Sequence, residues 1–196
     1  MIIVDSEWSG VDASKHSVLS IGALDFYNPS NQYYGECKIW DGAHISDEAI
    51  AVNGFTKEQC TDPAKMPEGE LIKEFIRWGE QCRNHTFAGQ NVGVDLSFLR
   101  TAAFRAHVNW PFAQRVIDLH TLAYFHMLKR GIKPPEENKR SALNMEAISA
   151  YVGIPAEQKP HNALNGAKQA AECFSRLIHD RSLLPEFQTH SIPWVG

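Results

Sequence analysis

Two carboxylates lie near the amino end of the chain, where Asp5-Ser6-Glu7 follows the β-branched run Ile2-Ile3-Val4. On a β-strand, residues i and i+2 point to the same face, so the side chains of Asp5 and Glu7 project together. Carboxylates this close repel each other unless one is protonated or a cation lies between them. On an edge strand they could simply be solvated. The apolar run, however, predicts a central strand that ends at Trp8-Ser9-Gly10, a natural place for a site.

A third carboxylate, Asp95, lies in the segment Asn91–Leu99, where a strand and a loop give way to an apolar-periodic helix. An aspartate that caps the helix would explain this position. A carboxylate that the start of a helix carries into a site would explain it as well. The pattern by itself allows both interpretations.

His161 precedes the last predicted helix, in the segment Pro160-His161-Asn162-Ala163-Leu164. A lone histidine in such a place is usually a surface or capping residue. Imidazoles titrate near neutrality, however, and a junction between a loop and a helix offers the mobility that a general base often needs. His161 is therefore a candidate for proton transfer.

In this order and at this spacing, the three segments resemble the DEDD superfamily of 3′→5′ exonucleases, in the branch that bears a histidine (DEDDh). That family has D-x-E on the first strand, N-x-x-x-D-x-x-F-L at a mid-chain helix and H-x-A-L-x-D-A near the end. The matching residues here are Asp5/Glu7, Asn91/Asp95 and His161–Ala167. The resemblance covers residues 1–178, with further landmarks at Ser20–Ala23, Val52–Gly54, Asp118–Leu122, Leu143–Ala147 and Gly153–Pro155.

The resemblance implies an RNase H-like fold and the release of mononucleotides from single-stranded 3′ ends of DNA or RNA. RNase T, oligoribonuclease and the epsilon proofreading subunit of DNA polymerase III are members of this family. It also implies two Mg²⁺ or Mn²⁺ ions in the active site, because carboxylate oxygens suit these ions. Asp5 would bridge both ions, Glu7 and Asp95 would complete most of the metal shell, and His161 would accept the proton of the attacking water.

Four further residues are candidates for contact with the substrate, alongside Glu7. Trp8 could stack on the terminal base or pack at the end of its strand. Phe98 could wedge against the substrate, although packing in the core is favoured for it. Asn53 lies in the segment that resembles the family's substrate-side loop, and Asn91 opens the N-x-x-x-D motif.

The chain departs from the family at Gly166, where the family has its fourth metal-binding aspartate. Glycine cannot bind a metal through a side chain, Asn165 carries no charge, and Asp180 is too far along the helix to substitute. Three accounts remain open. The chain could be an engineered inactive variant or a natural degenerate exonuclease that binds ends without cutting. Alternatively, water and Asn165 could fill the gap and leave weak activity.

The elements that must position these residues are predicted from hydrophobic periodicity and turn signals. Three strands come first and form an antiparallel meander, and later strands alternate with helices, so the fold class is α/β with a mixed sheet. Strands are expected at residues 2–4, 18–26, 33–40, 86–89 and 115–117. Helices are expected at residues 46–52, 68–82, 96–107, 119–129, 141–152 and 167–178. Residues 56–67 and 129–140 read as polar or loop-like segments.

The composition indicates a globular protein. Its 196 residues suit one exonuclease-like domain, residues 1–196, in which residues 179–196 form a C-terminal tail. The formal net charge of −4 argues against coating of long duplexes but permits a site that grips a short single-stranded end. The four cysteines form no C-x-x-C pair, which favours buried thiols in a reducing, cytoplasmic compartment. No apolar stretch is long enough to span a membrane. The oligomeric state is not indicated.

A second class of function stays open beside the enzyme. The chain could be a catalytically inactive scaffold, or a module that binds nucleic-acid ends, built on the exonuclease fold. Metal binding distinguishes them, because an exonuclease requires Mg²⁺ or Mn²⁺ and a scaffold does not.

Overall fold

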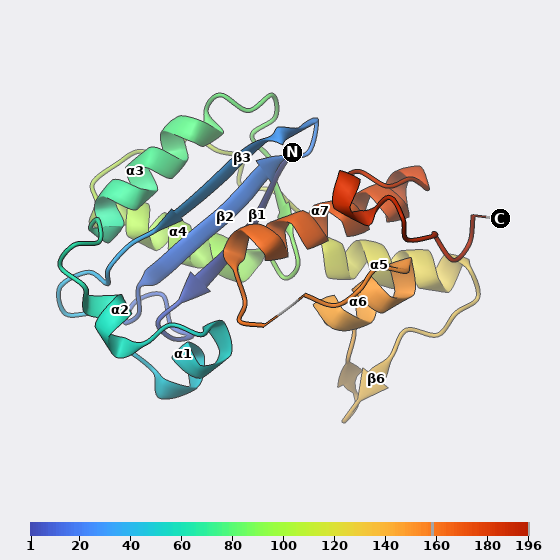
Figure 1. Cartoon of the computed structure of the whole chain (residues 1–196), viewed down its shortest axis with the longest axis horizontal. Coiled ribbons are helices and arrows are strands. Elements are labelled where there is room, and N and C mark those ends of the chain that lie inside the picture. Colours follow the sequence, from blue (N-terminus) through green and yellow to red (C-terminus); the bar gives the residue numbers. More distant parts are fainter. Residues whose placement is uncertain (158, 196) are drawn as a thin grey trace.

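The computed structural model describes residues 1–157 and 159–195, and its centre is a mixed five-stranded sheet in the order β3-β2-β1-β4-β5 (Figure 1). β1 pairs antiparallel with β2, and β2 pairs antiparallel with β3, so the predicted meander is confirmed. β4 runs parallel to β1, and β5 runs parallel to β4. The strands are β1 (Ile2–Trp8), β2 (Val18–Asp25), β3 (Asn28–Glu36), β4 (Phe87–Gly89) and β5 (Val116–Asp118).

Helices cover both faces of the sheet (Figure 1). Helices α3 and α4 pack on one face, and α5, α6 and α7 pack on the other. The short α1 and α2 lie beyond the end of β1. The helices are α1 (Asp47–Asn53), α2 (Lys57–Thr61), α3 (Glu68–Gly79), α4 (Gly93–Arg105), α5 (Leu119–Lys129), α6 (Met145–Val152) and α7 (Ala163–His179), with a 3₁₀ turn at Pro185–Phe187.

The alternation of side chains along β1 divides the hydrophobic core in two. Ile2 and Val4 belong to the cluster beneath α3 and α4, whereas Ile3 belongs to the cluster beneath α5, α6 and α7. Asp5 and Glu7 follow Ile3 by two and four residues, so their side chains lie on the same face and point toward α7. Ser6 lies on the opposite face, toward α4. The carboxylates of β1 therefore stand on the side of the sheet that α7 covers.

A close approach between α7 and the sheet fixes where that helix begins. Gly22 lies opposite Asp5 in the register of β1 and β2. A Cβ atom on Gly22 would stand 2.1 Å from the carbonyl carbon of Ala163 and 2.1 Å from the backbone nitrogen of Leu164. The first turn of α7 thus rests directly on the backbone of β2, and the absence of a side chain at residue 22 makes this possible.

We expect Gly22→Ala to destabilise the protein, because backbone atoms of α7 cannot move aside as a flexible side chain could. The free energy of unfolding should fall by ~1–3 kcal/mol or more, since this is the usual cost of overpacking a core. Gly93→Ala is the matched control, since a Cβ atom at Gly93 would meet nothing within 4 Å. Urea denaturation should show Gly93→Ala to be unchanged or slightly more stable. Equal stability of the two variants would contradict this account of the contact.

Several predicted boundaries were wrong. The third strand occupies Asn28–Glu36 rather than residues 33–40, because the chain already reverses at Phe26-Tyr27. The polar segment 56–67 contains α2, which Thr56 opens with a capping box. The loop-like segment 129–140 leads into a small hairpin of β6 (Glu136–Glu137) and β7 (Arg140–Ser141). Helix α7 begins at Ala163 rather than 167, because Asn162 caps it.

The segment after α7, which lacks periodicity, is held by a buried ion pair. Arg176 and Glu172 are both 0% exposed, and Arg176 Nε donates to Glu172 Oε1 at 2.7 Å. Arg176 also donates to the carbonyl oxygens of Phe187, His190 and Ser191, and Glu172 accepts from the backbone of Leu183 and Leu184. These bonds satisfy two buried charges and attach the segment to α7.

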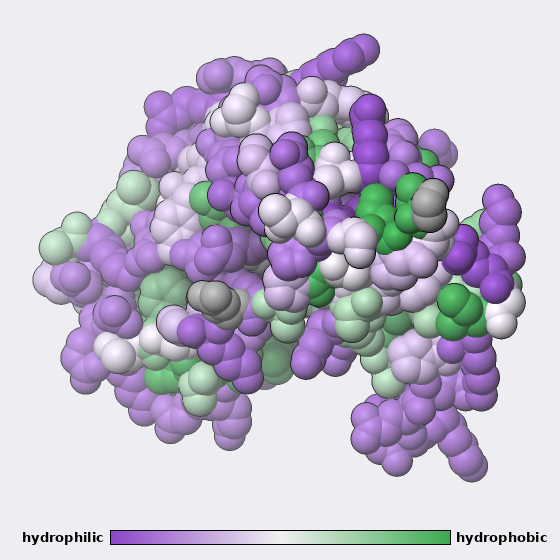
Figure 2. Space-filling model, turned by 45° about the vertical axis from the view of Figure 1, so that its right-hand side comes forward, coloured by the Kyte–Doolittle hydropathy of each residue, from purple (hydrophilic) through white to green (hydrophobic). Residues whose placement is uncertain are grey.

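The visible surface in Figure 2 is mostly hydrophilic, with small, separate hydrophobic areas. The β6–β7 hairpin projects from the lower right of this view and is hydrophilic throughout. Among the described residues, no helix has the length and apolar character required to cross a membrane.

Candidate active site

The contact between Asp5 and Gly166 defines the centre of the candidate site. Because α7 begins above Gly22, its first turn carries Gly166 to the neighbouring strand β1, beside Asp5. A Cβ atom on Gly166 would lie 2.1 Å from Asp5 Oδ2 and 2.9 Å from its carboxyl carbon. A side chain at residue 166 would therefore enter the space that the Asp5 carboxylate now occupies. This is the position where the fourth acidic residue was expected.

Asp95 joins the site from the other side of β1. Its side chain is only 2% exposed, and Ser6 Oγ donates a hydrogen bond to Asp95 Oδ1 at 2.7 Å. Asp95 sits in the first turn of α4 and does not cap it, because α4 begins at Gly93. β4 pairs with β1 only as far as Ile3, so this edge of β1 is open beside Asp5. The start of α4 fills the opening.

Burial and mutual repulsion raise the pKa values of the three carboxylates. Burial, followed by the negative charges of Asp95 and Glu7, holds the pKa of Asp5 well above its usual range. Burial raises the pKa of Glu7 to about 7, against the opposing influence of His161. Burial also raises the pKa of Asp95 to about 7, although hydrogen bonds from Ser6 act in the opposite direction. The hydrogen bonds and charges that surround the three carboxylates therefore do not bring their pKa values back to the usual range.

Trp8 and Phe98 form one aromatic stack next to the carboxylates. Their ring centroids are 4.8 Å apart and the rings are inclined by 9°. Trp8 is partly buried and donates through Nε1 to Ser6 Oγ at 2.7 Å, whereas Phe98 is 0% exposed. Phe98 thus lies in the core beneath Trp8, which leaves no surface for the substrate contact assigned to it. Its burial prevents that contact.

The two asparagine candidates occupy different environments. Asn53 is 4% exposed, and its Nδ2 donates to the carbonyl oxygen of Trp8 at 3.0 Å. Its Oδ1 accepts from Phe55 N, so this amide already ties the end of α1 to the end of β1. Asn91 is exposed with a φ of 52°, a left-handed conformation that asparagine tolerates. It forms the turn that leads into α4.

His161 stands in the loop that precedes α7. Its side chain is 34% exposed, and its Nδ1 lies 2.9 Å from Glu157 Oε2. His161 borders a cavity of about 210 Å³ that also includes Tyr34, Asn53 and Gly54. A Cβ atom on Gly54 would lie 2.6 Å from Pro160, so the loop after α1 packs against the histidine loop. The structure thus brings Asn53 and His161 to one cavity.

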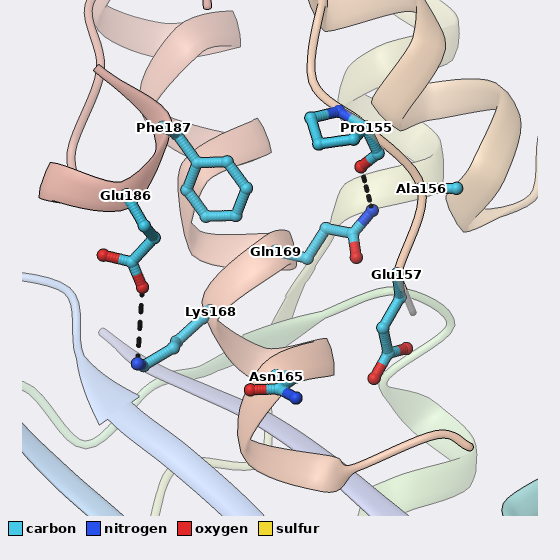
Figure 3. A pocket seen from close by; sticks show the side chains of 8 residues that line it. All are labelled: Pro155, Ala156, Glu157, Asn165, Lys168, Gln169, Glu186 and Phe187. Atoms are coloured by element: carbon cyan, nitrogen blue, oxygen red, sulfur yellow. Dashed lines mark hydrogen bonds and ion pairs between the residues drawn. The ribbon is translucent and has the colours of Figure 1, made fainter. Parts of the chain in front are cut away.

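Neither of the residues considered as substitutes for an aspartate at 166 faces the carboxylates. Asn165 is exposed and lines the pocket shown in Figure 3, whose lining residues do not include Asp5, Glu7 or Asp95. Asp180 ends α7 in a left-handed conformation and accepts from Trp194 Nε1 at 2.6 Å. The expectation that Asn165 could fill the gap is therefore not supported by its position.

Carboxylate oxygens are the ligands that Mg²⁺ and Mn²⁺ prefer, and Asp5, Glu7 and Asp95 supply them. A divalent cation would relieve the repulsion that raises their pKa values. Among the described residues, no three histidine, cysteine, aspartate or glutamate side chains are grouped closely enough to hold an ion as they stand. The three carboxylates thus supply the donor atoms that these metals prefer, and they would have to move closer together to share an ion.

Two residues of the site were missed in the sequence. Ser6, between the two acidic residues of β1, holds Asp95 by a hydrogen bond, and Glu157 contacts His161. Strand alternation could have placed Ser6 toward α4. Glu157 belongs to no motif, and only its spacing of four residues from His161 could have indicated it.

Comparison with known proteins identifies the family to which the chain belongs. The family described as "Exonuclease" matches residues 2–174. A ribonuclease T from Haemophilus influenzae (strain PittEE) is 24% identical over an alignment of 197 positions, gaps included, and the alignment covers 91% of this chain and 79% of the relative. The 3′-5′ DNA exonuclease Cap18 from Escherichia coli is 28% identical over 188 residues, which cover 90% of each protein.

Solved structures show the same fold. Exonuclease I of E. coli, in complex with an oligonucleotide, superposes with a TM-score of 0.71 at 17% identity. The match covers 91% of this chain and 41% of that protein, so the chain spans about two fifths of its length. The nuclease domain of 3′hExo, a DEDDh family member bound to rAMP, gives a TM-score of 0.67 at 16% identity, with 93% of both chains covered. The mixed sheet between helices is thus the RNase H-like exonuclease fold, and this chain belongs to the exonuclease family, within the superfamily of DEDD-type 3′→5′ exonucleases.

Proposed function

We propose that this protein acts on 3′ ends of single-stranded DNA or RNA as a DEDDh 3′→5′ exonuclease that releases mononucleotides, with a rate lowered by Gly166. One observation carries the proposal. A Cβ atom on Gly166 would lie 2.1 Å from Asp5 Oδ2, so a side chain at the position of the missing acidic residue would meet the Asp5 carboxylate directly. The family match over residues 2–174 supports the reaction class.

Each residue has a role that its position supports. Asp5, Glu7 and Asp95 would hold two Mg²⁺ or Mn²⁺ ions, which when bound activate water and stabilise the leaving oxygen. His161, beside the cavity of about 210 Å³, would accept the proton of the attacking water.

The remaining site residues would hold the substrate. Trp8 would offer the ring face that Phe98 does not cover to the terminal base, and Glu7 would contact the same nucleotide. Asn53 would keep Trp8 in place through its hydrogen bond to the Trp8 carbonyl oxygen. Asn91 would set the turn that brings Asp95 to the site.

A second function is favoured by one specific observation, the absence of a side chain at Gly166. With one carboxylate fewer, the site could bind a 3′ end without cutting it. In that case the protein would be an end-binding or scaffold module, and substitution of His161 would leave its affinity for nucleic acid unchanged.

The test uses 5′-labelled single-stranded DNA and RNA oligonucleotides with Mn²⁺. We expect a slow ladder of products shortened from the 3′ end, which Asp95→Asn reduces by on the order of 10²-fold because a misplaced reaction centre costs about this much. Asp180→Asn is the control at the opposite end of α7 and should leave the rate unchanged. Metal-dependent binding to 3′ ends without shortening would favour the end-binding module. If the protein neither binds nor shortens these oligonucleotides, both functions are excluded.

We also propose a cytoplasmic location. Cys37, Cys60, Cys82 and Cys173 are all free and buried, as expected in a reducing compartment.

A further inference from the structure

We propose that Glu157 is a positioning residue that fixes the tautomer and the orientation of the His161 ring. The inference rests on the proposed function, in which His161 is the general base. No family motif includes residue 157, and Glu157 comes from the loop after α6. Its contacts with the histidine loop carry the argument.

Glu157 uses both carboxylate oxygens on this loop. Oε2 lies 2.9 Å from His161 Nδ1, and Oε1 accepts a hydrogen bond from the backbone nitrogen of Asn162 at 3.0 Å. Asn162 in turn caps α7, since its Oδ1 accepts from the backbone nitrogens of Leu164 and Asn165. One carboxylate therefore links the imidazole to the start of the helix that carries Gly166.

The segment that carries Glu157 is itself anchored. The buried Gln169 donates through Nε2 to the carbonyl oxygen of Pro155 at 3.1 Å and to Ser149 Oγ at 2.6 Å. Figure 3 shows Glu157 and Gln169 on the wall of a pocket of about 240 Å³. Lys168, the cation of this pocket, pairs with Glu186 at 3.3 Å. The Glu157 side chain is only 12% exposed, so water competes little for its oxygens.

The consequence for His161 follows from hydrogen-bond chemistry. An ionised carboxylate only accepts hydrogen bonds, so Nδ1 of a neutral imidazole at 2.9 Å must carry the proton. Nε2 then holds the lone pair, and among the described residues it makes no hydrogen bond. A base that accepts a proton through Nε2 needs this tautomer. A free imidazole in water prefers the opposite one, so Glu157 reverses the preference.

The test measures the tautomer directly, by long-range ¹H–¹⁵N correlation spectra of the full chain, recorded at a pH at which the ¹⁵N shifts show the ring to be neutral. His161→Ala assigns the signals. We expect the Nδ1-protonated form to dominate in the unaltered protein and the Nε2-protonated form to dominate in Glu157→Ala. Glu157→Gln keeps the shape of the side chain and should give a mixture, because an amide can donate as well as accept. Glu186→Ala removes the other carboxylate of the same pocket and should change nothing.

A dominant Nε2-protonated form in the unaltered protein would overturn the proposal, and so would a tautomer that Glu157→Ala leaves unchanged. This result does not depend on catalysis, so it is separate from any failure of the proposed function. In a Gly166→Asp background that cuts, Glu157→Ala should also lower kcat by about 10- to 100-fold with little change in KM. Losses of this size are typical when the partner behind a functional histidine is removed.

Discussion

Replacing Gly166 by aspartate is expected to raise 3′→5′ degradation of single-stranded oligonucleotides by about 10²–10³-fold, because a missing charge-stabilising group at a reaction centre costs this much. The structure places the new side chain against Asp5, where a fourth carboxylate would complete the metal shell. Gly166 also lies in the first turn of α7, where the helix dipole favours a negative charge. The fold should therefore accept the substitution.

The substitution requires one local adjustment. A Cβ atom on Gly166 would lie 2.1 Å from Asp5 Oδ2, which is the far end of a flexible side chain, so Asp5 can rotate away. Without metal, the two carboxylates would repel each other and lower the melting temperature. With Mn²⁺, they would share the ion, so calorimetry should show tighter Mn²⁺ binding than in the unaltered protein.

Gly166→Asn is the matched control, because asparagine has the shape of aspartate without its charge. It should gain neither Mn²⁺ affinity nor activity. His161→Ala in the Gly166→Asp background should remove the gained activity, since the water then loses its base. If Gly166→Asp folds, binds Mn²⁺ and cuts neither DNA nor RNA, the catalytic assignment is wrong. Mn²⁺ affinity equal to that of the unaltered protein would place residue 166 outside the metal shell.

The features of the site that depend on local periodicity could be predicted from the sequence. The period of two along a strand places Asp5 and Glu7 on one face, and in the structure α7 covers this face. The apolar-periodic segment after Asp95 is helical, and the helix brings this aspartate to the open edge of β1. These predictions succeeded because each depends on neighbours in the chain.

The features that depend on tertiary contact could not be predicted. Glu157 meets His161 only because Gln169 anchors the segment before it, and no periodicity connects these residues. The third strand begins earlier than predicted because the chain already turns at Phe26-Tyr27. In each case tertiary packing overrode the local pattern.

The close approach at Gly22 has two consequences for the site. Gly22 lets α7 touch the sheet opposite Asp5, and that contact places residue 166 beside the same aspartate. Because the backbone geometry is set at Gly22, the position of residue 166 does not depend on its own side chain. A glycine at residue 166 therefore changes the chemistry of the site and leaves its architecture intact.

The metal-free protein is expected to lose stability as the pH rises from about 5 to 8, the reverse of the usual behaviour of paired acids. Burial raises the pKa of Glu7 from 4.5 to about 7 and that of Asp95 from 3.8 to about 7. Between the unfolded and the folded pKa values, the folded protein holds more protons than the unfolded chain, so its stability falls as the pH rises. Each pKa unit corresponds to about 1.4 kcal/mol.

The free energy of unfolding in EDTA should therefore fall by on the order of 3 kcal/mol or more between pH 5 and pH 8. Glu7 and Asp95 together contribute less than their two separate shifts would give, because the carboxylates share their repulsion, and Asp5, whose pKa is raised as well, adds to the fall. Exposed acids with lowered pKa values, such as Asp12, titrate below this range. His126, whose pKa burial lowers, acts in the opposite direction and is common to all variants compared. Asp95→Asn should flatten the profile, since it removes one of the three carboxylates with raised pKa values.

Mn²⁺ should reverse the trend, because ions bind the ionised carboxylates of the folded protein and stabilise it more as the pH rises. Urea denaturation at pH 5 and pH 8, with EDTA or with Mn²⁺, measures the four free energies that the comparison needs. A metal-free protein that gains stability toward pH 8 would show that the carboxylates are already neutralised by partners within the fold. The cluster would then be a structural network, and the need for a divalent cation at this site would disappear.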